Sequence, residues 1–223
     1  MSRTLDYEGL VRVFRAAAAR VKSGAERLGE LDSAIGDGDH GVAMTRAMNA
    51  LEEGIDQCRA TTQKALLQGV AMSVMSIDAG STGPLLGSLM LGMGEPIGDA
   101  AEIDTERLAS MFESGLARLL AISKANVGDK TMVDALSPAV DALKTAASDG
   151  DSVAAALEKA AAAAEVGAES TRDFQAKFGR ARNLGERAIG YQDPGATSMA
   201  MFFRGCADGA ASVGNNNKNI DPD

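Results

Sequence analysis

The segment Leu31–Gly41, LDSAIGDGDHG, places three aspartates and the only histidine of the chain within eleven residues. Carboxylates gathered in this way are hard oxygen ligands that suit Mg²⁺, an ion often shared between carboxylates and phosphates. An EF-hand calcium loop is excluded because the twelfth position from Asp37 is Met48 rather than glutamate. A purely structural interpretation, in which the aspartates cap a helix and shape a turn, stays open. We favour a divalent-metal site at Asp32, Asp37 and Asp39.

His40 follows these aspartates and would stand at the start of the next helix. There it could donate a hydrogen bond to a phosphate, act in acid–base chemistry, carry a phosphoryl group, or only satisfy local hydrogen bonds. The segment DAGSTGP, residues 78–84, adds Ser81 and Thr82 beside glycines, and such hydroxyl and backbone N–H groups suit phosphate oxygens. The sequence lacks the G-x-x-x-x-G-K-[ST] pattern of a P-loop. The flanking segments have helical period, which argues against the phosphate hairpin of actin-like sugar kinases.

A second set of charged residues lies in GRARNLGERAIGYQDPG, residues 179–195. Arg180, Arg182 or Arg187 could stabilise charge on a transferred phosphoryl group, or serve only surface solubility. Lys130 has the same two interpretations. Met132, at the start of another helix, could lie against an adenine or pack in the core.

Composition excludes several classes of partner. The chain has 31 acidic and 22 basic residues, and its net charge of −9 would repel nucleic acid and anionic membrane surfaces. The most apolar segment, PLLGSLMLGMG, falls short of the about 20 residues that a membrane span needs. Cys58 and Cys206 form no C-x-x-C pair, and MSRTLDYEGL does not resemble a signal peptide. We therefore expect a cytoplasmic protein that binds neither nucleic acid nor membrane.

Apolar residues recur at helical spacing along most of the chain, and the composition, with 4% aromatic residues, favours close-packed helices over sheets. The pattern predicts eight helices, at about residues 6–28, 40–55, 61–76, 85–93, 105–124, 132–147, 152–178 and 193–209. We expect a single all-α domain over residues 1–211, built as an antiparallel up-and-down bundle. Residues 212–223, SVGNNNKNIDPD, read as a flexible tail.

In an up-and-down bundle, successive connections alternate between the two ends. The first, third, fifth and seventh connections are LDSAIGDGDHG, DAGSTGP, NVGDKT and GRARNLGERAIGYQDPG, all rich in glycine and polar residues. The other three, DQCRAT, GEPIGDAAEID and SDGD, are chemically plainer. Because each polar connection opens a helix, four helix N-termini with unpaired N–H groups should face one place. That rim is expected to bind an anion, and phosphate suits it.

Four motifs, ELDSAIGDGDHG, DAGSTGPLLG, VGDKTMVDAL and GRARNLGERAIGYQDPGATS, resemble in order the signature segments of the nucleotide-binding (DhaL-type) subunit of dihydroxyacetone kinase. The resemblance spans nearly the whole chain and implies an eight-helix antiparallel barrel with ADP or ATP at one rim. It implies two Mg²⁺ ions held by Asp32, Asp37 and Asp39. It also implies nucleotide contacts at His40, Gly41, Val42, Ala43, Ser81, Thr82, Met132, Arg180, Asp193, Pro194 and Gly195, with Arg180 near the transferred phosphoryl group. Ser123 departs from the family pattern, in which glycine is common, and this argues against nucleotide contact there.

The resemblance further implies a kinase subunit that is active only with a substrate-binding (DhaK-type) partner, which holds a short-chain ketose. The residues leave open whether ATP exchanges as a substrate or whether bound ADP is recharged by a DhaM-type phosphocarrier protein. They also leave the identity of the ketose open. One alternative is a nucleotide-responsive module that docks a regulator and transfers no phosphate. Another is a metal-dependent phosphohydrolase, for which the sequence offers no evident nucleophile or base beyond His40.

Overall fold

The structure is a computed structural model, and residues 3–59, 61–98 and 100–212 are described here. Over these ranges it contains nine α-helices, three short 3₁₀ segments and no β-strand, which confirms the all-α class. The α-helices are α1 (Tyr7–Ser23), α2 (Ala25–Ile35), α3 (His40–Gln57), α4 (Gln63–Met75), α5 (Thr82–Met93), α6 (Thr105–Ser123), α7 (Val133–Ser148), α8 (Val153–Ser170) and α9 (Pro194–Ala211). The 3₁₀ segments are η1 (Glu95–Ile97), η2 (Thr171–Asp173) and η3 (Arg180–Ala188). Apart from Ser212, the tail predicted over 212–223 lies outside the described residues.

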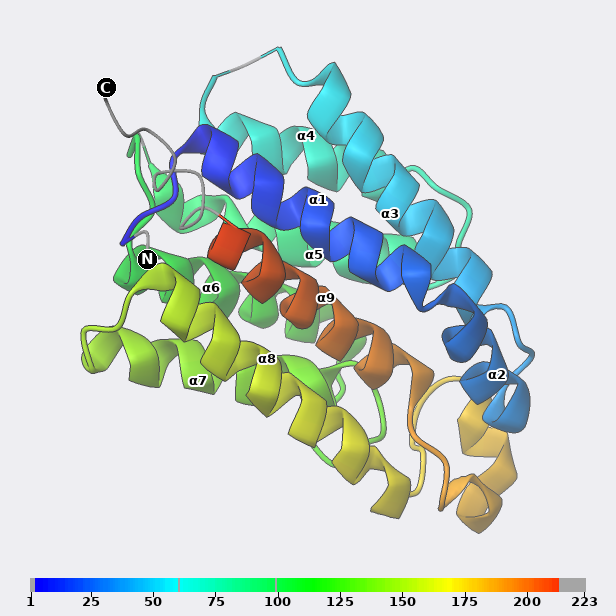
Figure 1. The fold of residues 1–223 in the computed structure, drawn as a ribbon. Helices are drawn as coiled ribbons and strands as arrows, with labels where there is room; N and C mark the ends of the chain where they lie inside the picture. Colours follow the sequence, from blue (N-terminus) through cyan, green and yellow to red (C-terminus); the bar gives the residue numbers. More distant parts are fainter. Residues whose placement is uncertain (1–2, 60, 99, 213–223) are drawn as a thin grey trace, which may run out of the picture.

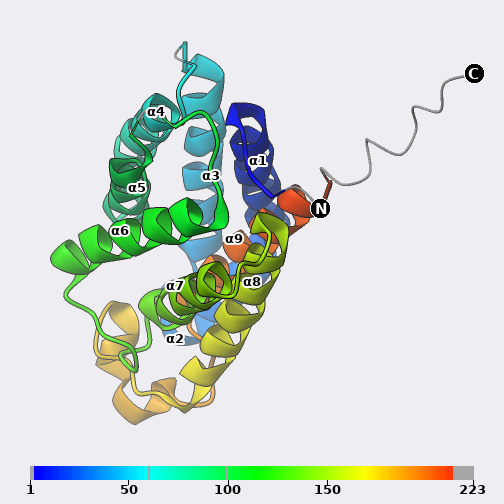
Figure 2. The same ribbon diagram turned by 90° about the vertical axis from the view of Figure 1, so that its left-hand side faces the viewer.

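Eight of the helices pack in a closed ring. Along the chain α1 packs on α3, each helix from α3 to α8 packs on the next, and α9 packs on both α8 and α1. Figures 1 and 2 show this arrangement, with α1 beside α9 and α3 beside α4. In the described part of the chain, no helix is both long and apolar enough to span a membrane.

The first helix was predicted over residues 6–28, and this prediction is wrong. The structure has two helices there, because α1 ends at Ser23 and α2 begins after Gly24. Glycine is a poor helix former, and the thioether of Met201 fills the space in which a Cβ at position 24 would stand, 2.5 Å from its sulfur. Since α2 runs to Ile35, Asp32 lies on a helix, and the connection to α3 covers only residues 36–39.

The seventh predicted helix, over residues 152–178, also ends early. The side chains of Ser170 and Thr171 donate hydrogen bonds to the carbonyls of Gly167 and Ala168, at 2.7 and 2.6 Å. Such bonds compete with the helical ladder, and α8 stops at Ser170.

Residues 171–193, which we call the arm, join α8 to α9. The arm contains η2 and η3, so the connection predicted as irregular has a short helical segment of its own. Both views place η3 at the end of the molecule where α2 lies, and η3 contacts α2 (Figures 1 and 2).

The core depends on close approach between helix backbones. A Cβ at Gly205 of α9 would stand 2.5 Å from the Cα of Ala17, and one at Gly209 would stand 2.8 Å from the Cα of Val13. This contact brings α1 and α9 together without large side chains between them. At the centre, the rings of Phe112 and Phe203 lie 5.0 Å apart.

We expect Gly205→Ala to lower the free energy of unfolding by about 1–3 kcal/mol, because its methyl group overpacks the contact between α1 and α9. The matched control is Gly69→Ala on α4, where the nearest atom to an added Cβ is 3.8 Å away. That substitution should raise stability by up to about 1 kcal/mol, since alanine favours a helix interior. Urea denaturation of both variants measures the difference, and equal effects would contradict this account of the packing.

Candidate functional site

Four connections meet around one cavity of about 980 Å³. They precede α3, α5, α7 and α9, the four helices whose polar connections were expected at a common rim. Thirteen of the fourteen residues predicted for the site line this cavity: Asp32, Asp37, Asp39, His40, Val42, Ala43, Ser81, Thr82, Met132, Arg180, Asp193, Pro194 and Gly195. The alternation of connections therefore located the cavity correctly.

Gly41 is the exception and does not line the cavity. A Cβ at this position would stand 2.0 Å from the backbone oxygen of Ala25, at the point where α3 crosses α2. Only glycine permits this crossing, which holds the start of α3 against the helix that carries Asp32.

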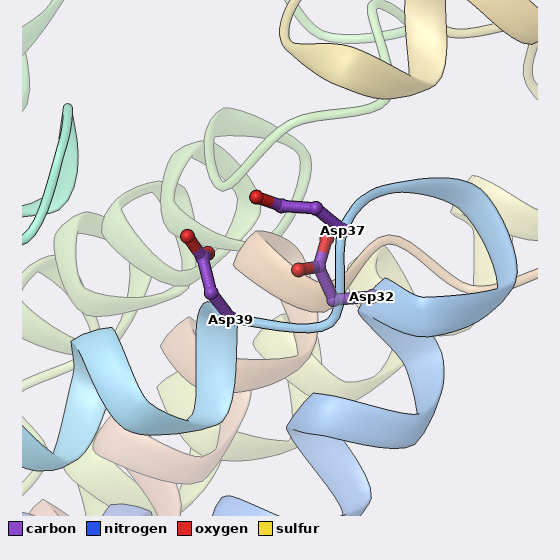
Figure 3. A group of neighbouring side chains, drawn as sticks. All are labelled: Asp32, Asp37 and Asp39. Atoms are coloured by element: carbon purple, nitrogen blue, oxygen red, sulfur yellow. The ribbon is translucent and has the colours of Figure 1, made fainter.

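The carboxylates of Asp32, Asp37 and Asp39 converge on one space (Figure 3). One oxygen from each lies within 4.8 Å of the others. We call these residues the acid cluster. Gly36 makes room for it, because a Cβ there would stand 2.1 Å from a carboxylate oxygen of Asp32. Three hard oxygen donors so close together repel one another without a cation and fit the ligand preference of Mg²⁺.

The helix N-termini at this rim differ from those at the opposite end. The residues before α1, α4, α6 and α8 all accept a backbone N–H on their side chains: Asp6, Thr62, Asp104 and Ser152. Among the described residues, Asp39, Ser81 and Met132, which precede α3, α5 and α7, make no such side-chain cap. The N–H groups of Val133, Asp134 and Ala135 at the start of α7 nevertheless donate to Thr131 and Met132. N–H groups at the starts of α3 and α5 therefore remain available at the cavity, and an anion suits them.

His40 links the start of α3 to α9. Its backbone N–H donates to Asp32 at 3.2 Å, and its Nε2 lies 3.0 Å from the hydroxyl of Ser198. Burial lowers the pKa of His40 against the opposing effect of Asp32 and Asp39. Ser198 was not predicted, although it lies one helical turn after Pro194 and so shares a face with it.

Arg180 reaches the acid cluster from the arm, where its guanidinium forms an ion pair with Asp37. The arm rests on α2 through a small apolar cluster of Ile35, Ala176 and Ala188. Arg182 and Arg187, which the sequence left as equal candidates, do not line the cavity.

Sequence reasoning missed part of the cavity wall. Arg46 lines the cavity and donates to the carbonyl of Asp78 at 3.1 Å, joining α3 to the connection before α5. The spacing of Asp39, Ala43 and Arg46 places all three on one face of α3, and this signal could have found the arginine. Ile122, half exposed, adds an apolar patch to the wall.

The structure places two further residues, Lys130 and Ser123, differently from the sequence-based predictions. Lys130 was considered as a phosphate ligand or a surface residue. It lines the cavity, but its side chain is buried and its amino group donates to the carbonyls of Thr171 and Tyr191. Ser123, where nucleotide contact was doubted, does line the cavity.

Asp193 caps α9 by accepting the N–H of Ala196 at 2.7 Å, and it is only 8% exposed. Burial raises the pKa of Asp193 to about 7, although the N–H of Ala196 and the charge of Lys130 lower it. A titratable carboxyl thus lies in the wall of the cavity next to Pro194 and Gly195.

The fold and the site together define an all-α protein with an acidic cavity between open helix N-termini. Residues 34–208 match the family described as the DAK2 domain, and the chain belongs to this family. It is 36% identical over 200 residues to the ADP-binding subunit DhaL of PEP-dependent dihydroxyacetone kinase 1 from Listeria innocua, covering 90% of this chain and 95% of the relative. It is 38% identical over 180 residues to the corresponding DhaL subunit from Escherichia coli, covering 81% and 86%.

Longer relatives are similar to this chain over only part of their own length. It is 33% identical over 201 residues to D-erythrulose kinase of Mycolicibacterium smegmatis, covering 89% of this chain but 35% of that enzyme. The crystal structure of the dihydroxyacetone kinase of C. freundii matches with a TM-score of 0.71 and 26% identity, over 89% of this chain and 34% of that one. The complex of the same kinase with AMP-PNP and Mg²⁺ matches with a TM-score of 0.67 and 26% identity, over 88% and 33%. The chain therefore spans about a third of these proteins.

We expect the carboxyl of Asp193 to make stability depend on pH. Its pKa of about 7 lies above the ordinary 3.8, so the folded chain binds its proton more tightly and loses stability as pH rises from about 4 to about 7. Asp193→Asn keeps a capping side chain but cannot titrate.

The free energy of unfolding of Asp193→Asn minus that of the parent should therefore rise over this interval and then level off. Urea denaturation of both proteins between about pH 4 and about pH 7 measures this difference in the free energy of unfolding. A difference that stays constant with pH would show that the carboxyl of Asp193 does not titrate in this interval.

Proposed function

We propose that this chain is the nucleotide-binding subunit of a kinase for dihydroxyacetone or a related short-chain ketose. In this proposal it binds Mg²⁺ with ADP or ATP and passes a phosphoryl group to a ketose held by a partner subunit. The observation that carries the proposal is the acid cluster facing uncapped helix N-termini within one cavity. The names of the DhaL relatives and of the AMP-PNP complex support it.

The acid cluster would hold the metal, with two Mg²⁺ ions shared among Asp32, Asp37 and Asp39. Bound Mg²⁺ would offset the negative charge of the phosphates and of the transferring phosphoryl group. The chain itself fixes the ligands, because Asp32 projects from the last turn of α2 and Asp39 immediately precedes α3. Ligands on helix ends vary little in position, and this favours a preformed site.

The phosphates would lie at the helix starts. At the start of α3, Gly41 and Val42 would offer backbone N–H groups to phosphate oxygens, with His40 and Ala43 beside them. Ser81 and Thr82, before and at the start of α5, would offer their hydroxyl groups. Met132 would lie beside the adenine. Gly195 allows α9 to begin close to this residue, because a Cβ there would stand 3.4 Å from the backbone nitrogen of Met132. Asp193, Pro194 and Gly195 would complete the nucleotide site.

Arg180 would act on the reacting phosphate. Its guanidinium is 67% exposed and already lies against the acid cluster, so it can exchange Asp37 for a phosphoryl oxygen without leaving the site. A cation placed there would stabilise the charge that develops during transfer.

We infer the need for a partner subunit by comparing the length of this chain with the lengths of its relatives. The chain covers 95% of a relative named as a kinase subunit but only 35% of a single-chain erythrulose kinase. The remaining part of the single-chain enzyme would correspond to a separate DhaK-type subunit that holds the ketose. Because the DhaL relatives are named PEP-dependent, we also propose that ADP stays bound and is recharged by a DhaM-type phosphocarrier.

We expect Asp37→Ala to abolish measurable binding of Mg–ADP in isothermal titration calorimetry. The free energy of unfolding should change by less than about 1 kcal/mol, because the ion pair with Arg180 is exposed and the remaining carboxylates repel each other less. Asp56→Ala, which removes an exposed ion pair with Arg15 near the other end of α3, is the control and should bind normally. Equal affinity of the Asp37 variant and the parent would refute the metal role.

Arg180→Ala should bind Mg–ADP within about threefold of the parent, yet phosphoryl transfer in the reconstituted kinase should fall by about a thousandfold or more. Arg182→Ala changes an exposed arginine outside the cavity and should transfer at the normal rate. Transfer assays with the partner subunit measure both variants. Normal transfer by Arg180→Ala would refute the role of this arginine, whereas absence of transfer by the parent chain with its partner would favour a nucleotide-responsive module that docks a regulator.

A further inference from the structure

The two ends of the arm meet at a hydrogen-bonded neck, which we define as Thr171, Arg172, Gly190, Tyr191 and Asp193. The N–H of Gly190 donates to the carbonyl of Arg172 at 2.8 Å, and the N–H of Asp193 donates to the hydroxyl of Thr171 at 2.8 Å. The amino group of Lys130 bridges the neck from the connection before α7. It donates to the carbonyl of Thr171 on one side and to that of Tyr191 on the other.

Lys130 occupies an unfavourable position for a lysine. Its side chain is 2% exposed, and burial lowers its pKa against the opposing charges of Asp193 and Asp134. Its backbone has φ of +61°, a left-handed conformation that a non-glycine residue adopts at a cost. The buried carboxylate of Asp134 holds this conformation by accepting the N–H groups of Gly128 and Thr131. The connection is thus built to present one amino group to the neck.

Asp129, the residue before Lys130, makes a second set of contacts with the arm. Asp129 is buried, its carboxylate accepts the amino group of Lys177 at 2.6 Å, and its carbonyl accepts the N–H of the same residue at 3.1 Å. Lys177 lies three residues before Arg180. Asp129 and Lys130 therefore fix the arm both at its neck and close to the arginine.

The contacts that Arg180 makes itself hold its position less firmly than the buried contacts of Asp129 and Lys130 hold the arm. Its ion pair with Asp37 joins a largely exposed guanidinium to a partly exposed carboxylate, and such pairs are weak in water. The place of Arg180 over the acid cluster must therefore come from the anchoring of the arm. Both carbonyls that accept the amino group of Lys130 belong to the arm, so these hydrogen bonds stabilise the arm.

We propose that Lys130 is a positioning residue that closes the neck of the arm and thereby holds Arg180 over the acid cluster. This proposal rests on the proposed function, in which Arg180 acts on the transferred phosphoryl group. Lys130 lines the cavity, but its amino group donates to the two neck carbonyls, so it would act through the arm and not on the reacting atoms.

The first test does not depend on catalysis. Hydrogen–deuterium exchange of the full chain should show amide exchange in residues 171–193 about tenfold faster in Lys130→Met than in the parent, with the ring helices unchanged. The control, Lys144→Met, removes an exposed ion pair with Glu113 and should leave the arm as protected as before. Unchanged exchange in the arm of Lys130→Met, or faster exchange throughout the molecule, would overturn the proposal.

The second test measures transfer with the partner subunit. Lys130→Met should lower kcat by about tenfold to a hundredfold with the nucleotide KM within about threefold, because a misplaced arginine impairs the transition state more than ground-state binding. In the Arg180→Ala background the same substitution should lower kcat by less than about threefold. Additive losses would contradict a role through Arg180. If Arg180→Ala alone has no effect, the role proposed for Arg180 fails and Lys130 cannot act through it, and the exchange experiment still decides whether Lys130 closes the neck.

Lys130→Gln keeps N–H donors on a shorter side chain and should give arm exchange between those of the parent and Lys130→Met. If neither variant shows a single cooperative unfolding transition, Lys130 serves the stability of the whole domain and the positioning role is rejected.

Discussion

The mutual repulsion of three carboxylates at the junction of α2 and α3 is the constraint around which the cavity is organised. Asp32, Asp37 and Asp39 offer oxygens within 4.8 Å of one another, a separation at which like charges are costly unless cations or N–H groups offset them. Protein groups offset part of this charge: Asp32 accepts the N–H of His40, and Asp37 pairs with Arg180. The remaining charge favours divalent cations, and the uncapped starts of α3 and α5 favour an anion beside them. A metal-bound phosphate satisfies both demands at once.

The ring of helices brings these groups together because alternate connections fall at the same end. Small residues make the ring tight, and Gly205 and Gly209 let α9 approach α1 closely. Helix α9 therefore has two roles: it closes the ring between α8 and α1, and it supplies residues to the site. Its first turn supplies Pro194 and Gly195, and Ser198, one turn further on, holds the ring of His40.

Most of the helices and the place of the site could be predicted from the sequence, because both depend on local patterns. Helical spacing of apolar residues locates helices, and the alternation of glycine-rich connections locates the rim. The break at Gly24 was missed, although a glycine inside a helical pattern is a local signal. The contact of this position with Met201, far along the chain, leaves no such signal. The burial of Lys130 also escaped prediction, because its carbonyl partners at Thr171 and Tyr191 carry no side-chain signal. Gly41 looked like part of a phosphate loop, but its contact with Ala25 is set by a helix crossing.

The most direct test of the account is a crystal structure of the chain grown with ADP and Mn²⁺, recorded at a wavelength where manganese scatters anomalously. Manganese takes the same oxygen ligands as Mg²⁺ and can be located by its signal. The account predicts anomalous peaks between the carboxylates of Asp32, Asp37 and Asp39, with the ADP phosphates at the N-termini of α3 and α5. A nucleotide bound elsewhere, or bound here with no metal at the acid cluster, would contradict it.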